Sequence, residues 1–78
     1  MNIFVDNLPL EVTEKDVREV FEAFGVVESV IIIKNKYTGQ SRRFGFVEIA
    51  AEVKAQLAIK ELNGMEMKGR TLKVKQVP

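Results

Sequence analysis

A short stretch in the middle of the chain, from Arg42 to Ile49, restricts the fold more than any other, because its apolar residues alternate with a period of two. Successive side chains of a β-strand point to opposite faces, so Phe44 and Phe46 lie on one face and Val47 lies on the other. A strand that covers a core on one side normally carries polar residues on the other. We therefore predict a strand with one buried face and one exposed face that is unusually aromatic.

Exposed aromatic rings that follow two arginines are typical of a binding surface. A contiguous apolar patch on a protein surface usually marks a site of interaction. Aromatic rings stack on nucleic-acid bases, and arginines pair with phosphates. The arrangement of Phe44 and Phe46 behind Arg42 and Arg43 therefore favours a single-stranded nucleic acid as the partner.

Two motifs resemble the signatures of the RNA-recognition motif (RRM) family. The segment Arg42–Ile49 is similar to the family's octapeptide, K/R-G-F/Y-G/A-F-V-x-F/Y, but Arg43 replaces the usual glycine and Ile49 replaces the final aromatic residue. The segment Ile3–Leu8 is similar to the family's second signature, a hexapeptide on the first strand. The two motifs occur in the expected order and at the expected separation, and the resemblance covers nearly the whole chain.

The rest of the chain alternates between strand and helix patterns. Strands are predicted over residues 2–6, 27–34, around Phe44 and over 70–76, with a hairpin loop over 35–41. One helix is predicted from the N-cap Thr13 to a stop at Gly25, and the other over residues 52–63. Each helix has one apolar stripe at the spacing i, i+3, i+4, i+7. The stripes comprise Val17, Val20, Phe21 and Phe24 in the first helix, and Ala55, Ala58, Ile59 and Leu62 in the second.

Two helices with one apolar stripe each should pack on the same face of one sheet and leave the opposite face open. The resemblance implies an α+β fold of the ferredoxin-like βαββαβ type, with a four-stranded antiparallel sheet in the order 4-1-3-2. We expect residues 1–78 to form a single domain of this kind. The order 4-1-3-2 places Phe4, on the first strand, beside Phe44 and Phe46 on the third.

The resemblance also implies a site for single-stranded RNA. Phe4, Phe44 and Phe46 match the family's base-stacking positions, and Arg42 matches the basic first position of the octapeptide, a phosphate contact. The alternative is that the three rings only pack against each other and that Arg42 is a solvated surface residue.

Further candidates surround these rings. Arg43 could strengthen the phosphate contact or limit how closely a nucleotide approaches. Lys73 and Lys75 should lie on the open face of the last strand, and Tyr37 on the hairpin loop could fold over bound RNA. Ordinary surface exposure remains the alternative for these side chains. Asp6 on this face should weaken RNA binding, because its negative charge repels phosphate.

Ile31 and Ile33 are unexpected on the second strand. If Val30 and Ile32 face the core, the alternation places Ile31 and Ile33 on the open face and widens its apolar patch. The alternative is a shift of register by one residue, which would exchange the two pairs. A patch this apolar favours a second hypothesis, in which the domain binds a protein partner or another copy of itself through Ile31 and Ile33.

Composition narrows the functional classes. The 78 residues include no cysteine and no histidine, which removes the commonest metal ligands and the commonest general base. We therefore expect no enzyme, no catalytic or metal site, no cofactor and no small-molecule substrate. The sequence shows no leader and no apolar run of membrane length, so we expect a cytoplasmic protein of bacterial type, or an organellar one. Its size resembles the stand-alone single-RRM proteins of bacteria, cyanobacteria and plant organelles.

Overall fold

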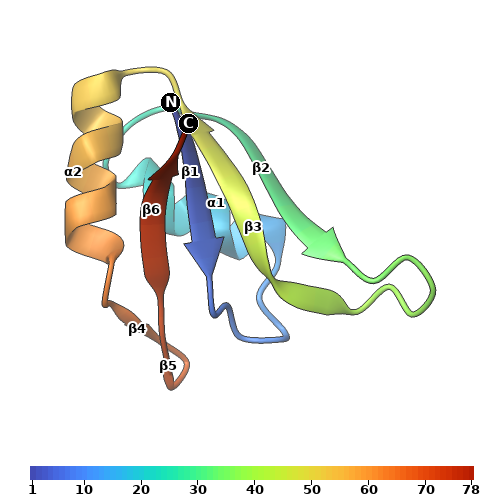
Figure 1. Ribbon diagram of the computed structural model, residues 1–78. Helices are drawn as coiled ribbons and strands as arrows, with labels where there is room; N and C mark the ends of the chain where they lie inside the picture. Colours follow the sequence, from blue (N-terminus) through green and yellow to red (C-terminus); the bar gives the residue numbers. More distant parts are fainter.

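The computed structural model describes residues 1–78 as two helices on one side of a four-stranded antiparallel sheet (Figure 1). The strands lie in the spatial order β2-β3-β1-β6, which confirms the predicted 4-1-3-2 order and the ferredoxin-like fold. The two ends of the chain are neighbours in the sheet, because Asn2 pairs with Val77. The elements are β1 (Asn2–Asp6), α1 (Glu14–Glu22), β2 (Val27–Lys34), β3 (Ser41–Ile49), α2 (Glu52–Leu62), β4 (Glu66–Met67), β5 (Arg70–Thr71) and β6 (Lys73–Val77).

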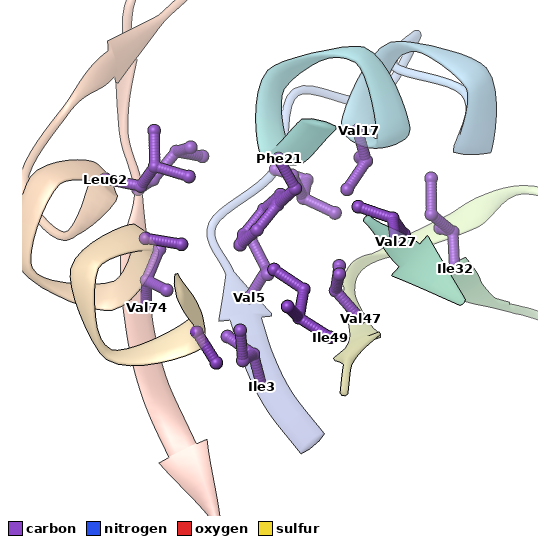
Figure 2. Packing of buried hydrophobic residues seen from close by; sticks show 14 of the residues in the cluster. Ile3, Val5, Val17, Phe21, Val27, Ile32, Val47, Ile49, Leu62 and Val74 are labelled. Carbon is purple, nitrogen blue, oxygen red and sulfur yellow. The ribbon is translucent and has the colours of Figure 1, made fainter. Parts of the chain in front are cut away.

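The core lies between the sheet and the two helices. Ile3, Val5, Val47 and Ile49, from the two central strands, are at most 1% exposed. Figure 2 shows Phe21 directed from α1 toward Val5 in the middle of this layer. Ala55, Ala58 and Leu62 close the layer from α2. No polar or charged side chain is buried, so the core is held by apolar contact alone.

Helix α1 starts as predicted. Thr13 is the N-cap, and its hydroxyl accepts a hydrogen bond from the Asp16 backbone N–H at 3.2 Å. The Asp16 carboxylate accepts from the Thr13 backbone N–H at 3.0 Å, which completes a capping box. Helix α2 lacks such a cap, because Ala51 at its N-cap has no side-chain acceptor. Neither helix has the length and apolar character needed to cross a membrane.

The predicted stop at Gly25 was wrong. Helix α1 ends at Glu22, with Ala23 as its C-cap in a right-handed conformation. Gly25 is not in the left-handed region. Its lack of a side chain matters for packing instead, because a Cβ there would lie 2.9 Å from the Cβ of Lys54 on α2. Gly25 therefore allows the chain after α1 to pass close to α2.

The predicted last strand over residues 70–76 is two elements. Residues Arg70–Thr71 form β5, which pairs with β4 in a separate small hairpin, and only Lys73–Val77 join the main sheet as β6. The turn of the hairpin is Lys68-Gly69, and both residues have positive φ, at 47° and 85°. Positive φ at both central residues is typical of a type I′ turn. In the sequence, this hairpin is indicated by a residue followed by glycine between two short extended segments. The inward direction predicted for Leu72 and Val74 is confirmed, since both are buried.

Candidate nucleic-acid interface

The face of the sheet opposite the helices is uncovered and carries three phenylalanines. In the antiparallel register Phe4 of β1 lies opposite Phe46 of β3, and Asp6 lies opposite Phe44. Residues paired in this way have their side chains on the same face. The structure therefore brings together the three rings that the two sequence motifs predicted to be neighbours.

The rings contact each other and leave their outer sides accessible. The centroid of the Phe4 ring lies 5.7 Å from that of Phe44 and 5.6 Å from that of Phe46, with tilted planes. Phe44 and Phe46 meet edge to face at 6.3 Å. These distances fall in the range of favourable aromatic pairs. All three rings are only half-buried and none belongs to the core, so they form an aromatic platform.

Two lysines of β6 border the aromatic platform (Phe4, Phe44 and Phe46). Lys75 lies opposite Phe4 in the register, and its Nζ lies 5.5 Å from the centroid of that ring. Lys73 lies opposite Asp6. Both lysines are exposed, and neither forms an ion pair with a carboxylate. Their charges are therefore free to meet an anion that approaches the open face.

The first arginine of the octapeptide is exposed, and the second adopts a backbone conformation that suits glycine. Arg43 has φ of 66°, in the left-handed region that side chains disfavour. The ladder is irregular here, because Ile32 pairs with Gly45 while Lys34 pairs with Ser41. The amide of Arg43 donates to the Ser41 hydroxyl at 2.9 Å, and its carbonyl accepts from the Leu8 amide at 2.9 Å. These bonds hold an arginine in a bulge where the octapeptide pattern has glycine.

Gly45, two residues further, is required for a different reason. A Cβ at this position would lie 2.2 Å from the backbone oxygen of Ile31. Only glycine therefore lets β2 approach β3 so closely, and this approach sets Ile31 opposite Phe46.

The two isoleucines of β2 differ in their surroundings. Ile31 is 51% exposed and extends the platform from Phe46, whereas Ile32 is 4% exposed, which rules out a register shifted by one residue. Ile33 is only half-buried and lies at the irregularity of the ladder, between the pairs formed by Ile32 and Lys34. The prediction of exposure therefore describes Ile31 better than Ile33, because the bulge interrupts the alternation.

The β2–β3 loop projects beyond the end of the sheet (Figure 1). The Asn35 side chain accepts hydrogen bonds from the amides of Tyr37 and Thr38, at 2.9 and 3.0 Å, which folds the loop tip. Tyr37 is 85% exposed, and the Nζ of Lys36 lies 5.1 Å from its ring centroid. Tyr37 pairs with none of the three phenylalanines, so the structure does not bring it to the platform.

Two shallow grooves flank Phe4 on the open face, each of about 310 Å³. Sequence reasoning missed four of the residues that line them, Gln76, Val77 and Pro78 at the end of the chain and Asn63 after α2. The first groove is lined by Phe4, Phe46, Lys75, Gln76, Val77 and Pro78. The second groove is lined by Phe4, Asp6, Asn63, Lys73, Val74 and Lys75.

The larger hollow of the surface, about 400 Å³, lies away from the platform, between the β2–β3 loop and the start of α1. Glu14 accepts a hydrogen bond from the Ile32 amide at 3.2 Å and lies 3.9 Å from the ammonium of Lys34. Its carboxylate therefore joins α1 to the outer strand and offsets the charge of Lys34. No group of three or more acidic residues is close enough to hold a metal ion.

Comparisons with known proteins agree with this geometry. A family model described as "RNA recognition motif" matches residues 3–73. The chain is 45% identical over 74 residues to the protein RbpA of Nostoc sp., covering 95% of this chain and 72% of that protein. It is 41% identical over 78 residues to the chloroplastic 29 kDa ribonucleoprotein A of Nicotiana sylvestris. This match covers the whole of this chain and only 29% of the relative.

Solved structures share the fold closely. The crystal structure of the RNA-binding protein PG1 superposes with a TM-score of 0.96 and 44% identity, covering 99% of this chain and 93% of that one. A Sex-lethal protein–RNA complex superposes with a TM-score of 0.94 and 32% identity, covering 99% of this chain and 46% of that one. These matches confirm the resemblance inferred from the octapeptide and the hexapeptide.

Proposed function

The chain belongs to the RNA recognition motif family, and from this premise we propose that it binds short single-stranded RNA on the open face of its sheet. Bases stack on Phe4, Phe44 and Phe46, and phosphates meet the cations around them. The family is one of RNA-binding domains and not of enzymes. The proposed activity is therefore non-catalytic binding by residues 1–78 acting as one module.

The observation that carries the proposal is the half-exposed aromatic platform on a face that no helix covers. Unpaired bases offer flat faces that stack on such rings, whereas bases in a duplex are already stacked. One ring contributes about 1–3 kcal/mol per base. Two or three stacked bases together with phosphate contacts give roughly 8 kcal/mol, which corresponds to micromolar affinity.

The phosphate contacts are assigned to Arg42, Arg43, Lys73 and Lys75. Arg42, Lys73 and Lys75 are exposed, and none of the four forms an ion pair within the chain. Tyr37 joins them only if the β2–β3 loop moves toward the bound RNA. Three or four neutralised phosphates on a single strand correspond to a slope of roughly −2 to −3 in log affinity against log salt.

The relatives support RNA as the partner. The similar Sex-lethal structure is a complex with RNA, and the similar Nicotiana sylvestris protein is a chloroplastic ribonucleoprotein. The chain spans 29% of that ribonucleoprotein, so the similarity extends to only one part of the relative. We propose the interior of a bacterial-type cell or of an organelle as the compartment, in line with the cyanobacterial and chloroplastic relatives.

The test is an RNA titration of the Phe44→Ala and Phe46→Ala variants, followed by fluorescence anisotropy of a labelled short single-stranded RNA. Each variant should lose about 1–3 kcal/mol of binding free energy. Val53→Ala is the matched control, because Val53 is an apolar residue that is 80% exposed on the outer side of α2. Unchanged affinity in both phenylalanine variants would refute stacking on the platform.

The second candidate function is binding of a protein or of another copy through the apolar extension of the platform. It is favoured by the exposure of Ile31 beside Phe46. The test is the double variant Ile31→Thr/Ile33→Thr, which keeps the β-branched shape. Sedimentation that shows a concentration-dependent mass in the wild type and a monomer in the variant, with RNA affinity unchanged, would support self-association through Ile31 and Ile33 as a function separate from RNA binding.

A further inference from the structure

The groove between β1 and β6 contains the right set of groups to recognise the edge of a base beside the Phe4 ring. Phe4, Asp6, Lys73, Lys75 and Asn63 line it. In the register Lys75 lies opposite Phe4, and Lys73 lies opposite Asp6, two residues further along β1. The volume, about 310 Å³, is enough for one base. We propose that this groove selects guanine and that Asp6 is the residue that determines the selection. The inference rests on the proposed function and deepens it.

Hydrogen bonds within the chain use only one of the two carboxylate oxygens of Asp6. Its Oδ1 accepts a hydrogen bond from the backbone N–H of Asn7 at 2.8 Å, and Oδ2 has no partner in the chain. Although Lys73 lies directly opposite in the register, the two form no ion pair. A negative charge on a face that meets phosphates lowers affinity for every RNA. A hydrogen bond from the ligand to the free Oδ2 would offset this loss.

An ionised carboxylate accepts hydrogen bonds and cannot donate them, so it selects the base that presents the most donors. Guanine presents its N1–H and its exocyclic N2 amine side by side. Adenine and cytosine present one amine next to a bare ring nitrogen, and uracil presents one N–H between two carbonyl oxygens. A bare acceptor next to Oδ2 is repelled. Guanine is therefore the best partner for the edge of the groove at Asp6.

The rest of the groove complements the other edge of guanine. The O6 and N7 atoms of guanine are acceptors, and a lysine ammonium is a donor that suits both. Lys75 already lies over the Phe4 ring, where a stacked base would meet its ammonium. The side-chain oxygen of Asn63 accepts from the Val74 amide at 3.0 Å, and its amide nitrogen has no partner in the chain and is one more donor. The lining of the groove thus combines one acceptor, Asp6, with the donors Lys73, Lys75 and Asn63.

The first experiment uses the wild-type chain and needs no variant. The probes are an oligouridine strand, the same strand with one central guanosine, and the same strand with one central inosine. Inosine lacks only the N2 amine, so it isolates the second donor. Uridine neighbours let the protein slide until the single purine occupies the groove. We expect guanosine to bind about tenfold more tightly than inosine, within the range of a good edge contact.

The second experiment assigns the preference to Asp6. Asp6→Asn keeps an oxygen to accept from the Asn7 amide, so the backbone is held as before, but it turns an NH2 group toward the ligand. Glu48→Gln is the matched control, because Glu48 lies on the same face, opposite Asn2 at the far end of β1, and loses the same charge. Both variants should bind oligouridine more tightly, but only Asp6→Asn should lose the guanosine-to-inosine preference.

The outcomes separate this inference from the function on which it rests. RNA binding without a guanosine preference in the wild type would overturn the selection of guanine and leave RNA binding intact. A preference that survives in Asp6→Asn would overturn the role of Asp6. An absence of binding to all three strands would overturn the proposed function and the inference together.

Discussion

The two faces of the sheet are built from the same strands and are both rich in apolar side chains, yet they differ in what covers them. On the inner face Val47 and Ile49 of β3 are fully buried under the helices. On the outer face Phe44 and Phe46 of the same strand are half-buried, by each other and by Phe4. Burial therefore follows the placement of the helices and not the hydrophobicity of the residue.

The difference separates stability from binding. An inner side chain contributes its transfer free energy when the chain folds, because the helices remove it from water. An outer ring stays partly in water after folding, so part of its transfer free energy is gained only when a ligand covers it. Substitutions on the inner face should therefore change the free energy of unfolding, and substitutions on the outer face should mainly change affinity.

The largest expected effect is the loss of stability in Phe21→Ala. Phe21 is 1% exposed and is the largest side chain of the core, so its removal leaves a cavity. The expected cost is about 3–5 kcal/mol. Phe46→Ala should cost clearly less. Denaturant unfolding of both variants, followed by circular dichroism, measures the contrast. An equal loss in the two variants would mean that Phe46 belongs to the core.

The second effect concerns the close contact between the strands β2 and β3 at Gly45. In Gly45→Ala the new methyl group would collide with the backbone oxygen of Ile31, so β2 must move away from β3. We expect a loss of about 1–3 kcal/mol of stability. Amide hydrogen exchange should show faster exchange in β2 than in β6. Uniform exchange in both strands would contradict a local separation of β2.

Arg43→Gly should act in opposite directions on stability and on binding. Glycine relieves the positive φ, which costs an arginine about 1–2 kcal/mol. Part of this gain is offset because glycine has more freedom in the unfolded chain. The variant should be slightly more stable by denaturant unfolding, and its salt slope for RNA should be shallower by about 0.7. Lower stability would show that the Arg43 side chain makes a contact that outweighs the strain.

The smallest effect is the pH dependence of the α1 cap, remote from both faces. The hydrogen bond from the backbone N–H of Thr13, followed by that of its side chain, lowers the pKa of Asp16 below its ordinary value of 3.8. A lowered folded pKa gives stability above the unfolded pKa, and this stability is lost as pH falls through the folded pKa. The stability gap between wild type and Asp16→Asn should therefore shrink below about pH 4. A gap that stays constant in acid unfolding would contradict the role of the charge.

The sequence predicted the fold because its local signals agree with each other. The period-two pattern around Phe44 indicates a strand, and the cap at Thr13 and the stripe around Phe21 indicate one helix. The structure has the strand β3 and the helix α1 at these residues. The prediction that Phe4 lies beside Phe44 and Phe46 followed from the strand order. That order came from the family resemblance, because periodicity alone does not rank strands in a sheet.

The remaining features depend on backbone detail that a pattern of hydrophobicity does not contain. The bulge at Arg43 displaces Ile33 from the alternation. The role of Gly25 depends on its distance from Lys54, a contact between segments far apart in the chain. The groove beside Asp6 needs Asn63, which approaches β6 only because α2 ends there.

RNA binding on the open face of the sheet is tested most directly by a nuclear magnetic resonance titration of the isotope-labelled protein with a short single-stranded RNA. We predict that the largest shifts occur at the residues of the platform, Phe4, Phe44 and Phe46, and at Lys75 beside it. Resonances of the outer sides of α1 and α2 should hardly move. Largest shifts on the helices, with the platform unaffected, would contradict the claim that the open face of the sheet binds RNA.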